Sequence, residues 1–107
     1  CLPHGFWKEW CAHVRSLNSN AYTTGELVGI APEYTGDEFD ALMNYPFAYC
    51  ISEFLIDRTT RVSATTFVQR LKELRDAYPP ATTRVMQNLM DSHDVNRLAS
   101  AIVNPDR

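Results

Sequence analysis

The 107-residue sequence contains no run of basic residues, and its formal net charge is −3 at pH 7. Domains that bind nucleic acids present clustered Lys and Arg side chains, so nucleic acid is not an expected partner. No apolar run approaches the roughly 18 residues that suggest a membrane-spanning helix, so a membrane is not an expected partner either. The first residues show no signal-peptide pattern and no Met, which indicates a cut end.

Closely spaced cysteines are absent as well. The three cysteines stand at positions 1, 11 and 50, and no C-x-x-C pair occurs, so the cysteines predict no zinc site. Cys11 and Cys50 are expected to be small buried side chains in a reducing compartment. A cytoplasmic location is therefore the expectation.

What remains is a composition typical of one small globular domain, with 45% hydrophobic and 21% charged residues. Apolar residues at helical spacing predict helices over 6–17, 47–56, 63–78 and 81–87. In the first of these helices, Trp7 and Trp10 share the apolar stripe and are expected to be buried, and Ser63 is the expected N-cap of the third. Strands are predicted over 21–28, 39–45 and 88–91, with a loop or short helix over 30–37. Strands that alternate with helices favour an α/β fold with a parallel sheet.

Titratable residues follow the first and third predicted strands at the points where these strands end. Glu26 closes the first strand, and His93 and Asp94 come directly after the third. Glu26 and Asp94 are 68 residues apart (94 − 26), or 34 per strand-to-strand step. An eight-unit barrel of about 250 residues uses roughly 31 per step, and its active site lies at the carboxyl ends of its strands. The spacing therefore predicts that these side chains converge on one rim, with one strand between them.

Other interpretations of these residues are weaker or less informative. A Glu at the end of a strand is commonly a plain surface residue. A hydrolase triad made of Ser92, His93 and Asp94 is disfavoured, because triad members meet in space whereas adjacent side chains point apart. A metal site made of Asp91, His93 and Asp94 lacks the second histidine that such sites usually have, so no metal site is expected.

Four motifs together resemble a known family. They are "YTTGE" at 22–26, "DEFDALMNYPF" at 37–47, "LKELRDAYP" at 71–79 and "NLMDSHDVNRL" at 88–98. In this order and spacing, the chain resembles glycoside hydrolase family 13, the α-amylase family, and its neopullulanase, cyclomaltodextrinase and maltogenic-amylase subgroup in particular. The resemblance covers nearly the whole chain and implies a (β/α)8 TIM barrel that retains configuration while acting on α-1,4 or α-1,6 glucosidic bonds.

The resemblance also assigns roles to individual residues. It implies that Glu26, at the end of the fifth barrel strand, is the general acid/base. It implies that Asp94, after the seventh strand, stabilises the transition state and that His93 hydrogen-bonds the same sugar ring. Arg97 matches a residue of the same loop, where a loop-bracing ion pair is the favoured interpretation.

Three further positions bear on substrate binding. Tyr45 ends the second predicted strand, from which its side chain is proposed to reach the cleft and contact substrate. His4 matches a histidine of the family, with an acceptor-side sugar contact and a helix-start capping role as its two interpretations. Val28 stands where many relatives have a Trp, which leaves the substrate preference open.

The resemblance implies that the catalytic nucleophile is an aspartate at the end of strand four, which would lie just before residue 1. The sequence then corresponds to a partial (β/α)8 barrel, from helix 4 through strand 7 and its loop, and residues 1–107 form a fragment of one catalytic domain. The isolated chain is expected to be an inactive part of a glycoside hydrolase. The alternative is a non-catalytic half-barrel module for carbohydrate binding or self-association.

The expected partner is an α-glucan or cyclomaltodextrin substrate. No cofactor is expected in this segment, and calcium is left open for the full-length parent. Three strands of a barrel leave two open edges and an uncovered inner face, near which four apolar residues are expected, namely Val28, Leu42, Met43 and Leu89. Self-association through these edges, or their coverage by the missing remainder of the barrel, is therefore also expected.

Overall fold

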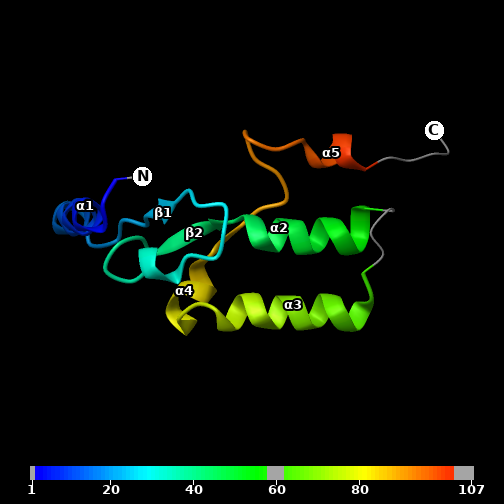
Figure 1. Ribbon diagram of the computed structural model, residues 1–107. Coiled ribbons are helices and arrows are strands. Elements are labelled where there is room, and N and C mark those ends of the chain that lie inside the picture. The colour runs from blue at the N-terminus through cyan, green and yellow to red at the C-terminus, as the bar shows by residue number, and fades with distance from the viewer. Residues whose placement is uncertain (1, 58–61, 103–107) are drawn as a thin grey trace.

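The computed structural model describes residues 2–57 and 62–102 (Figure 1). Its helices are α1 (His4–Leu17), α2 (Tyr45–Ile51), α3 (Ala64–Asp76), α4 (Pro80–Val85) and α5 (Leu98–Ala101). Its strands are β1 (Thr24–Gly25), β2 (Ala41–Asn44) and β3 (Gln87–Asn88). A 3-10 turn, η1 (Pro32–Tyr34), lies between β1 and β2, and a π-helical turn, η2 (Ser52–Ile56), continues α2. Within the described ranges, no helix has the length and apolar character needed to cross a membrane.

The three strands form one parallel sheet in the order β1-β2-β3, as the alternation of helices and strands predicted. Gly25 of β1 pairs with Leu42 of β2, and Asn44 of β2 pairs with Asn88 of β3. Because all three strands run the same way, the segments that follow them leave the sheet at one edge. The ends of β1 and β3 therefore lie on either side of the end of β2.

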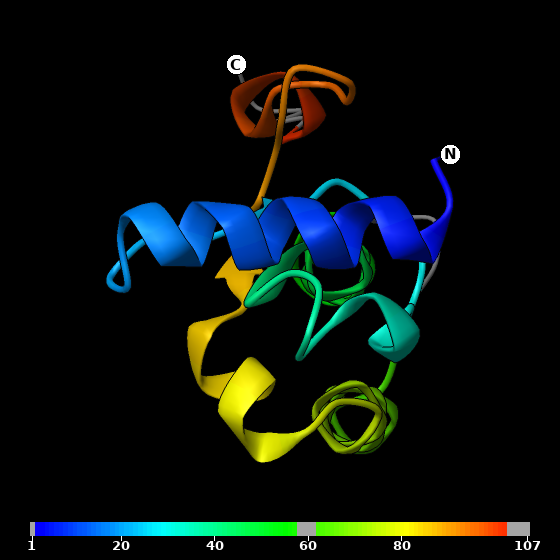
Figure 2. The same ribbon diagram turned by 90° about the vertical axis from the view of Figure 1, so that its left-hand side faces the viewer.

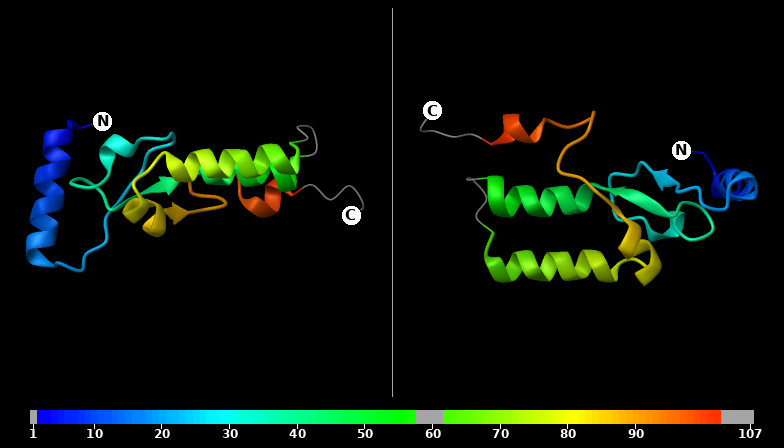
Figure 3. Two further views of the ribbon diagram at one scale, coloured as in Figure 1. Left: turned by 90° about the horizontal axis from the view of Figure 1, so that it is seen from below. Right: turned by 180° about the vertical axis from the view of Figure 1, so that it is seen from behind.

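The helices enclose the sheet only in part. α1 lies at one end of the molecule and runs across it, with the strands behind (Figure 2). α2 and α3 lie side by side and contact each other. α5 lies on the opposite side of α2 from α3, at the end of a long connection from β3 (Figure 3).

The helix boundaries agree with the sequence-based predictions where capping signals are strong. Ser63 is the N-cap of α3, and its hydroxyl accepts a hydrogen bond from the Thr66 N–H, as predicted. α3 ends at Asp76, two residues before the predicted end, and α4 begins at Pro80 and stops at Val85, before Gln87. A proline suits the first turn of a helix because it lacks the N–H that would be unpaired there.

The same rule explains why the assignment of Tyr45 to a strand is wrong. Tyr45 was assigned to the end of a strand, but it is the first residue of α2, with Pro46 in the first turn. Asn44 ends β2 and caps the helix, since its side-chain oxygen accepts a hydrogen bond from the Phe47 N–H at 3.2 Å. Strand and helix therefore meet without a loop, and Tyr45 stands at the carboxyl end of β2.

The strands are shorter than the patterns predicted. Residues 21–28 yield only Thr24–Gly25, and residues 88–91 yield Gln87–Asn88 shifted toward the N-terminus. The strands are short because few residues are paired. β1 pairs with β2 over two residue pairs, and β3 pairs with the other edge of β2 over two more. The residues beyond these ladders lack a partner strand that would hold them extended.

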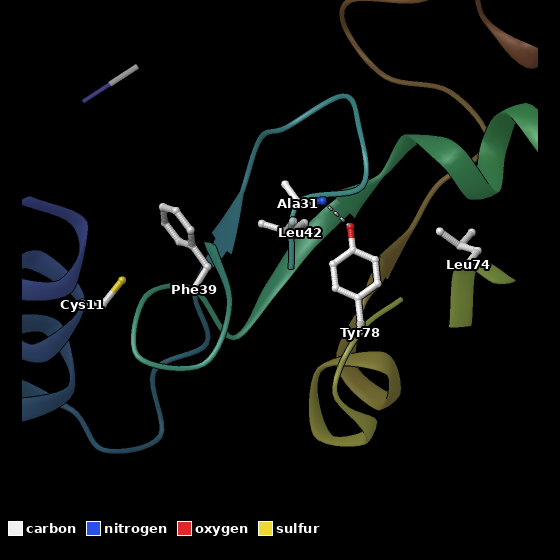
Figure 4. Close-up of a cluster of buried hydrophobic side chains, with 6 residues drawn as sticks. All are labelled: Cys11, Ala31, Phe39, Leu42, Leu74 and Tyr78. Atoms are coloured by element: carbon white, nitrogen blue, oxygen red, sulfur yellow. Dashed lines mark hydrogen bonds between the residues drawn. The ribbon is translucent and has the colours of Figure 1, made fainter. Parts of the chain in front are cut away.

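The hydrophobic core lies between α1, β2 and the end of α3. Its buried members are Cys11, Ala31, Phe39, Leu42, Leu74 and Tyr78 (Figure 4). The Tyr78 hydroxyl accepts a hydrogen bond from the Ala31 N–H at 3.1 Å, which satisfies a buried backbone donor. Burial raises the pKa of the Cys11 thiol, in agreement with the prediction that this cysteine is a buried core residue.

Several burial predictions are wrong. Cys50 and Trp7 are only half-buried, and Trp10 is 42% exposed. Leu42 was expected near an uncovered face, but it is 1% exposed and belongs to the core. Trp10 is exposed because it lines a cavity beside the outer edge of β1, where no further strand of the described chain covers it.

A row of basic side chains ties α1 to the acidic segment before β2. We call this row, His4, Lys8 and Arg15, the charged stripe. Its partners are Glu38 at 2.6 Å, Asp37 at 2.9 Å and Asp40 at 3.1 Å, respectively. Spacings of four and seven residues place the three basic side chains on one helix face. The charged stripe therefore fixes α1 against the connection between β1 and β2.

Candidate active site

Glu26 directly follows β1, and the residue before it explains how the strand end is placed. A Cβ atom at Gly25 would lie 2.8 Å from the Phe39 side chain and 2.9 Å from the Leu42 side chain. Both neighbours are buried, so a larger residue would force them to move. The absence of a side chain at Gly25 lets β1 approach the core and sets the position from which Glu26 extends.

The loop after β3 is held by Asp91. Its carboxylate accepts hydrogen bonds from the Leu98 N–H at 2.8 Å and from Arg97 at 2.9 Å. The hydrogen bond from the Leu98 N–H, and to a lesser extent the one from Arg97, lower the pKa of Asp91 below its ordinary value. The prediction that Arg97 makes a loop-bracing ion pair is confirmed. The ring closed between Asp91 and Leu98 holds the intervening residues in a compact loop.

This loop carries His93 and Asp94 to Glu26. His93 Nε2 lies 3.4 Å from Glu26 Oε1 and 3.5 Å from Asp94 Oδ1. One polar atom from each of the three residues lies within 4.8 Å of the other two. Glu26 follows β1 and the loop follows β3, with β2 between them, so the predicted convergence on one rim is confirmed.

The Tyr45 hydroxyl links Glu26 to the loop that carries His93 and Asp94. It is 2% exposed, and its hydroxyl donates a hydrogen bond to Glu26 Oε1 at 3.3 Å. The same hydroxyl lies 2.9 Å from Ser92 Oγ, which in turn accepts a hydrogen bond from the Asp94 N–H at 3.1 Å. With Tyr45 donating to Glu26, Ser92 donates to Tyr45. A continuous hydrogen-bonded chain therefore runs from the backbone of Asp94 to the carboxylate of Glu26.

Ser92 is the residue of this site that sequence reasoning did not assign. It was weighed only as a triad nucleophile and was set aside. It is 9% exposed and points toward Tyr45, so it orients other groups. Its place directly before His93 in the loop, together with its short polar side chain, is the signal that was available for such a role.

His4 lies outside the cluster of Glu26, His93 and Asp94. Its Nδ1 contacts Glu38, and its ring stacks on Tyr34 with ring centroids 4.2 Å apart. The predicted capping role is not seen, because the N-cap of α1 is Pro3 and no side chain caps it. The acceptor-side sugar contact stays a prediction.

Glu26 borders a cavity of about 290 Å³ with aromatic walls. Its aromatic lining consists of Trp7 and Trp10 of α1 together with Tyr34 and Phe39. A larger cavity, about 460 Å³, is lined mainly by residues of α3 and by Asn88, and it includes none of the clustered carboxylates. The site is therefore defined by the clustered side chains and the cavity beside Glu26.

The cluster combines functions that acid–base chemistry needs. Glu26 and Asp94 supply two carboxyl groups, and His93 supplies an imidazole that hydrogen-bonds or accepts a proton. The exposed fractions of the Glu26, His93 and Asp94 side chains are 46%, 67% and 66%, so a ligand can reach all three. The same atoms could also ligate a cation, with Glu26 in place of the Asp91 considered from sequence.

Comparisons with known proteins identify the family of this chain. The family described as alpha amylase, catalytic domain, matches residues 2–107. A cyclomaltodextrinase from Bacillus sp is 38% identical over 98 residues, which cover 91% of this chain and 17% of the relative. Neopullulanase 2 from Thermoactinomyces vulgaris is 35% identical over 101 residues, which cover 94% of this chain and 17% of the relative.

A solved structure of a cyclomaltodextrinase superposes with a TM-score of 0.89 at 36% sequence identity. The match covers 95% of this chain and 17% of that structure. The chain thus spans about one sixth of the length of the relatives that it matches. The family match over residues 2–107 includes all three strands together with Glu26, His93 and Asp94. The chain belongs to the alpha-amylase catalytic-domain family.

Proposed function

We propose that this chain is part of a retaining glycosidase or transglycosidase that acts on α-glucosidic bonds, with Glu26 as its general acid/base. Asp94 stabilises the positive charge of the transition state, and His93 hydrogen-bonds the same sugar. The observation that carries the proposal is the meeting of these three side chains at the ends of β1 and β3. The family match gives that meeting its chemical context.

The contacts of Glu26 suit proton transfer. Tyr45 and His93 both approach Oε1, so we assign Oε2 as the oxygen that carries the proton to the leaving group. Tyr45 is buried and fixes the orientation of the carboxyl group, so its role is positioning. A general acid needs this control because proton transfer requires a heavy-atom separation of about 2.6–3.2 Å.

Asp94 lies near enough to assist the same reaction. An oxocarbenium-like transition state develops positive charge at the anomeric carbon, and a fixed carboxylate beside that carbon stabilises it. The hydrogen bond from the Asp94 N–H to Ser92 holds this residue in the loop. His93 lies between the carboxylates of Glu26 and Asp94. It is therefore placed to donate a hydrogen bond to a hydroxyl of the sugar that contacts both carboxylates.

A retaining mechanism also needs a nucleophilic carboxylate about 5–5.5 Å from the acid. We assign this group to a segment outside the 107 residues, on the strand that precedes α1 in the resemblance. On this assignment the chain corresponds to helix 4 through strand 7 of one catalytic barrel. The substrates that we propose are α-glucans or cyclomaltodextrins; similar proteins include a cyclomaltodextrinase and a cyclic α-maltosyl-(1→6)-maltose hydrolase.

Reducing-sugar release from cyclomaltodextrin tests the proposal. The purified 107-residue chain is expected to give no turnover, and the complete barrel that contains it is expected to be active. Glu26→Gln in the complete barrel should abolish most of that activity while the fold stays intact. Turnover by the short chain that Glu26→Gln removes would place the nucleophile within these residues, and an inactive complete barrel would refute the proposal.

We also propose that further protein covers the outer edges of β1 and β3. Large apolar side chains are exposed at several places, including Leu17 at 76%, Val28 at 60% and Ile30 at 53%. A second copy of the chain or the rest of a barrel would cover such edges. Sedimentation velocity tests this directly: a stable, compact monomer of the 107-residue chain would count against it. A non-catalytic self-associating module predicts stable oligomers and no activity in any longer context.

A further inference from the structure

We propose that Glu26, His93 and Asp94 form a binding site for a zinc-type divalent cation, with a water molecule as the fourth ligand. The three side chains supply one imidazole nitrogen and two carboxylate oxygens, each an atom type that binds zinc. The cluster has one histidine, as the Asp91 group considered from sequence does, but here the three ligand atoms meet in space. The binding proposal stands on this geometry alone. Its consequence for catalysis rests on the function proposed above.

The interatomic distances match a tetrahedral ion. Zn²⁺ binds nitrogen and oxygen ligands at about 2.0–2.2 Å, and the tetrahedral angle then sets neighbouring ligand atoms about 3.3–3.6 Å apart. His93 Nε2 lies 3.4 Å from Glu26 Oε1 and 3.5 Å from Asp94 Oδ1. Two edges of the tetrahedron are therefore already in place. The third, between Glu26 and Asp94, is no longer than 4.8 Å and closes with a small rotation of one carboxylate.

The surroundings hold the carboxylate of Glu26 and the backbone of Asp94 in position. Tyr45 donates a hydrogen bond to Glu26, and Ser92 accepts one from the Asp94 N–H. Partners of this kind orient metal ligands and raise affinity, commonly by roughly 10–100-fold. Both partners are buried, at 2% and 9% exposure, so they are rigid supports for an open site.

Charge and ligand number favour zinc over calcium or magnesium. In the 107-residue chain the two carboxylates balance the charge of one divalent ion, and in the complete barrel the nucleophile assigned above adds a further negative charge nearby. Ca²⁺ takes 6–8 oxygen ligands, and Mg²⁺ keeps a nearly octahedral oxygen shell, whereas three protein ligands and a water satisfy zinc. Since all three side chains are exposed, an ion and its water can enter without any rearrangement of the core.

Other metal-binding groups of the described chain are less suitable. Asp91 is occupied by Arg97 and the Leu98 N–H, and Glu38 is fully buried against His4. Cys11 is buried, and the pKa of the Cys50 thiol is raised by burial, which disfavours the thiolate that binds metal. The cluster of Glu26, His93 and Asp94 is thus the site to test.

A bound ion would block the proposed reaction. Coordination of Glu26 removes the proton that a general acid must deliver. It also draws the negative charge of Asp94 to the metal and away from the sugar. Zinc is therefore expected to inhibit the complete barrel in competition with substrate, and a chelator is expected to restore activity.

Isothermal titration of the untagged 107-residue chain with Zn²⁺ at neutral pH tests the binding. One ion per chain is expected, with no comparable binding of Mg²⁺ or Ca²⁺. His93→Gln and Asp94→Asn should each weaken zinc binding at least about tenfold, the scale on which even supporting partners matter. His13→Gln is the matched control, because His13 is an exposed histidine on α1, and Cys50→Ser controls for the half-buried thiol.

The absorption spectrum of bound Co²⁺ reports the geometry, because a tetrahedral site absorbs far more strongly than an octahedral one. Circular dichroism of each variant shows whether its fold is intact, and the titration is repeated in the complete barrel if a variant fails to fold. Unchanged zinc affinity in folded His93→Gln and Asp94→Asn overturns the site. Zinc binding without glycosidase activity refutes the proposed function alone, and activity without zinc binding refutes this inference alone.

Discussion

Two contacts between a histidine and a glutamate in the described part of the chain differ in distance and in the burial of the glutamate. His4 Nδ1 lies 2.6 Å from Glu38, whose side chain is fully buried. His93 Nε2 lies 3.4 Å from Glu26, whose side chain is 46% exposed. The first pair is closed only on its glutamate side, where Glu38 is buried; the His4 side chain is 47% exposed and its ring stacks on Tyr34. The second pair is open to solvent on the rim of the sheet, so a ligand can replace the contact between His93 and Glu26.

The neighbourhoods of the two pairs reinforce this difference. The His4–Glu38 pair belongs to the charged stripe, which fixes α1 to the segment before β2. Glu38 Oε2 has no hydrogen-bond partner in the described chain, so His4 is the main compensation for a buried carboxylate. Removal of a partner from a buried polar group is expensive, whereas exposed pairs contribute little. One pair therefore stabilises the fold, and the other is free to serve a ligand.

The largest expected effect is a loss of activity when Glu26 is replaced, with no such loss when Glu38 is replaced. In the complete barrel, Glu26→Gln should reduce turnover of cyclomaltodextrin about 10²–10⁴-fold, because it removes the proton donor. Glu38→Gln keeps the shape of the side chain and should leave turnover per folded molecule unchanged. Steady-state kinetics on both variants, corrected for the folded fraction, make the comparison. If Glu38→Gln abolishes turnover in a folded protein, the closed pair is part of the catalytic machinery and the contrast is wrong.

The next largest effect comes from the strand end that carries Glu26. Gly25→Ala places a Cβ within 2.8 Å of Phe39 and 2.9 Å of Leu42 and should destabilise the fold by about 2–3 kcal/mol. It should also lower activity, because Glu26 moves with the strand. Urea unfolding measures the first effect. Gly29→Ala is the matched control, since a Cβ there meets nothing within 4 Å. Equal stabilities for the two variants would show that close packing does not set the position of β1.

A smaller effect distinguishes the two histidines by stability. His4→Ala leaves Glu38 buried without its partner and should lower the free energy of unfolding by about 1–2 kcal/mol. His93→Ala removes an exposed side chain and should change it by less than about 0.5 kcal/mol. Urea unfolding of both variants at one pH supplies the test. A larger loss for His93→Ala would mean that the open pair, too, holds the fold together.

The smallest effect is a pH dependence within the charged stripe. Burial raises the pKa of Asp40, but hydrogen bonds from Thr23 and Arg15 together outweigh it and bring this pKa below 3.8. The unfolded chain therefore binds the proton more readily, so this stabilisation is complete above about pH 4 and is lost as the pH falls through the folded-state pKa. Asp40→Asn should give a shallower decline of stability below pH 4 than wild type. Glu33→Gln, an exposed carboxylate of η1, should leave the profile unchanged, and an unaltered profile in Asp40→Asn would exclude this contribution.

The elements that sequence predicted well are those with local or regular signals. The parallel order follows from the alternation of helices and strands, and the Ser63 cap follows from its own short motif. The convergence of Glu26 with His93 and Asp94 follows from the spacing of strand ends, because parallel strands all finish at one edge. Element order, local capping motifs and the spacing of strand ends can all be read directly from the sequence.

The features that sequence missed depend on contacts between distant residues. Glu38 is separated from His4 by 34 positions, so its burial and pairing leave no local pattern. Ser92 and Tyr45 are 47 positions apart, and the bridge between them appears only when α2 begins directly after β2. The exposure of Trp10 was missed because the apolar stripe of a helix indicates which side avoids water and not what covers it.

The hydrogen-bonded chain from Glu26 through Tyr45 to Ser92 also has a consequence for the order in which the site assembles. The Glu26–Tyr45 contact closes a loop of 19 residues, and the Tyr45–Ser92 contact closes one of 47. Loop-closure entropy makes the longer closure less favourable by about 0.8 kcal/mol. We therefore expect the Glu26–Tyr45 contact to form more readily than the Tyr45–Ser92 contact, so that the loop of His93 and Asp94 docks on a hydroxyl already in place.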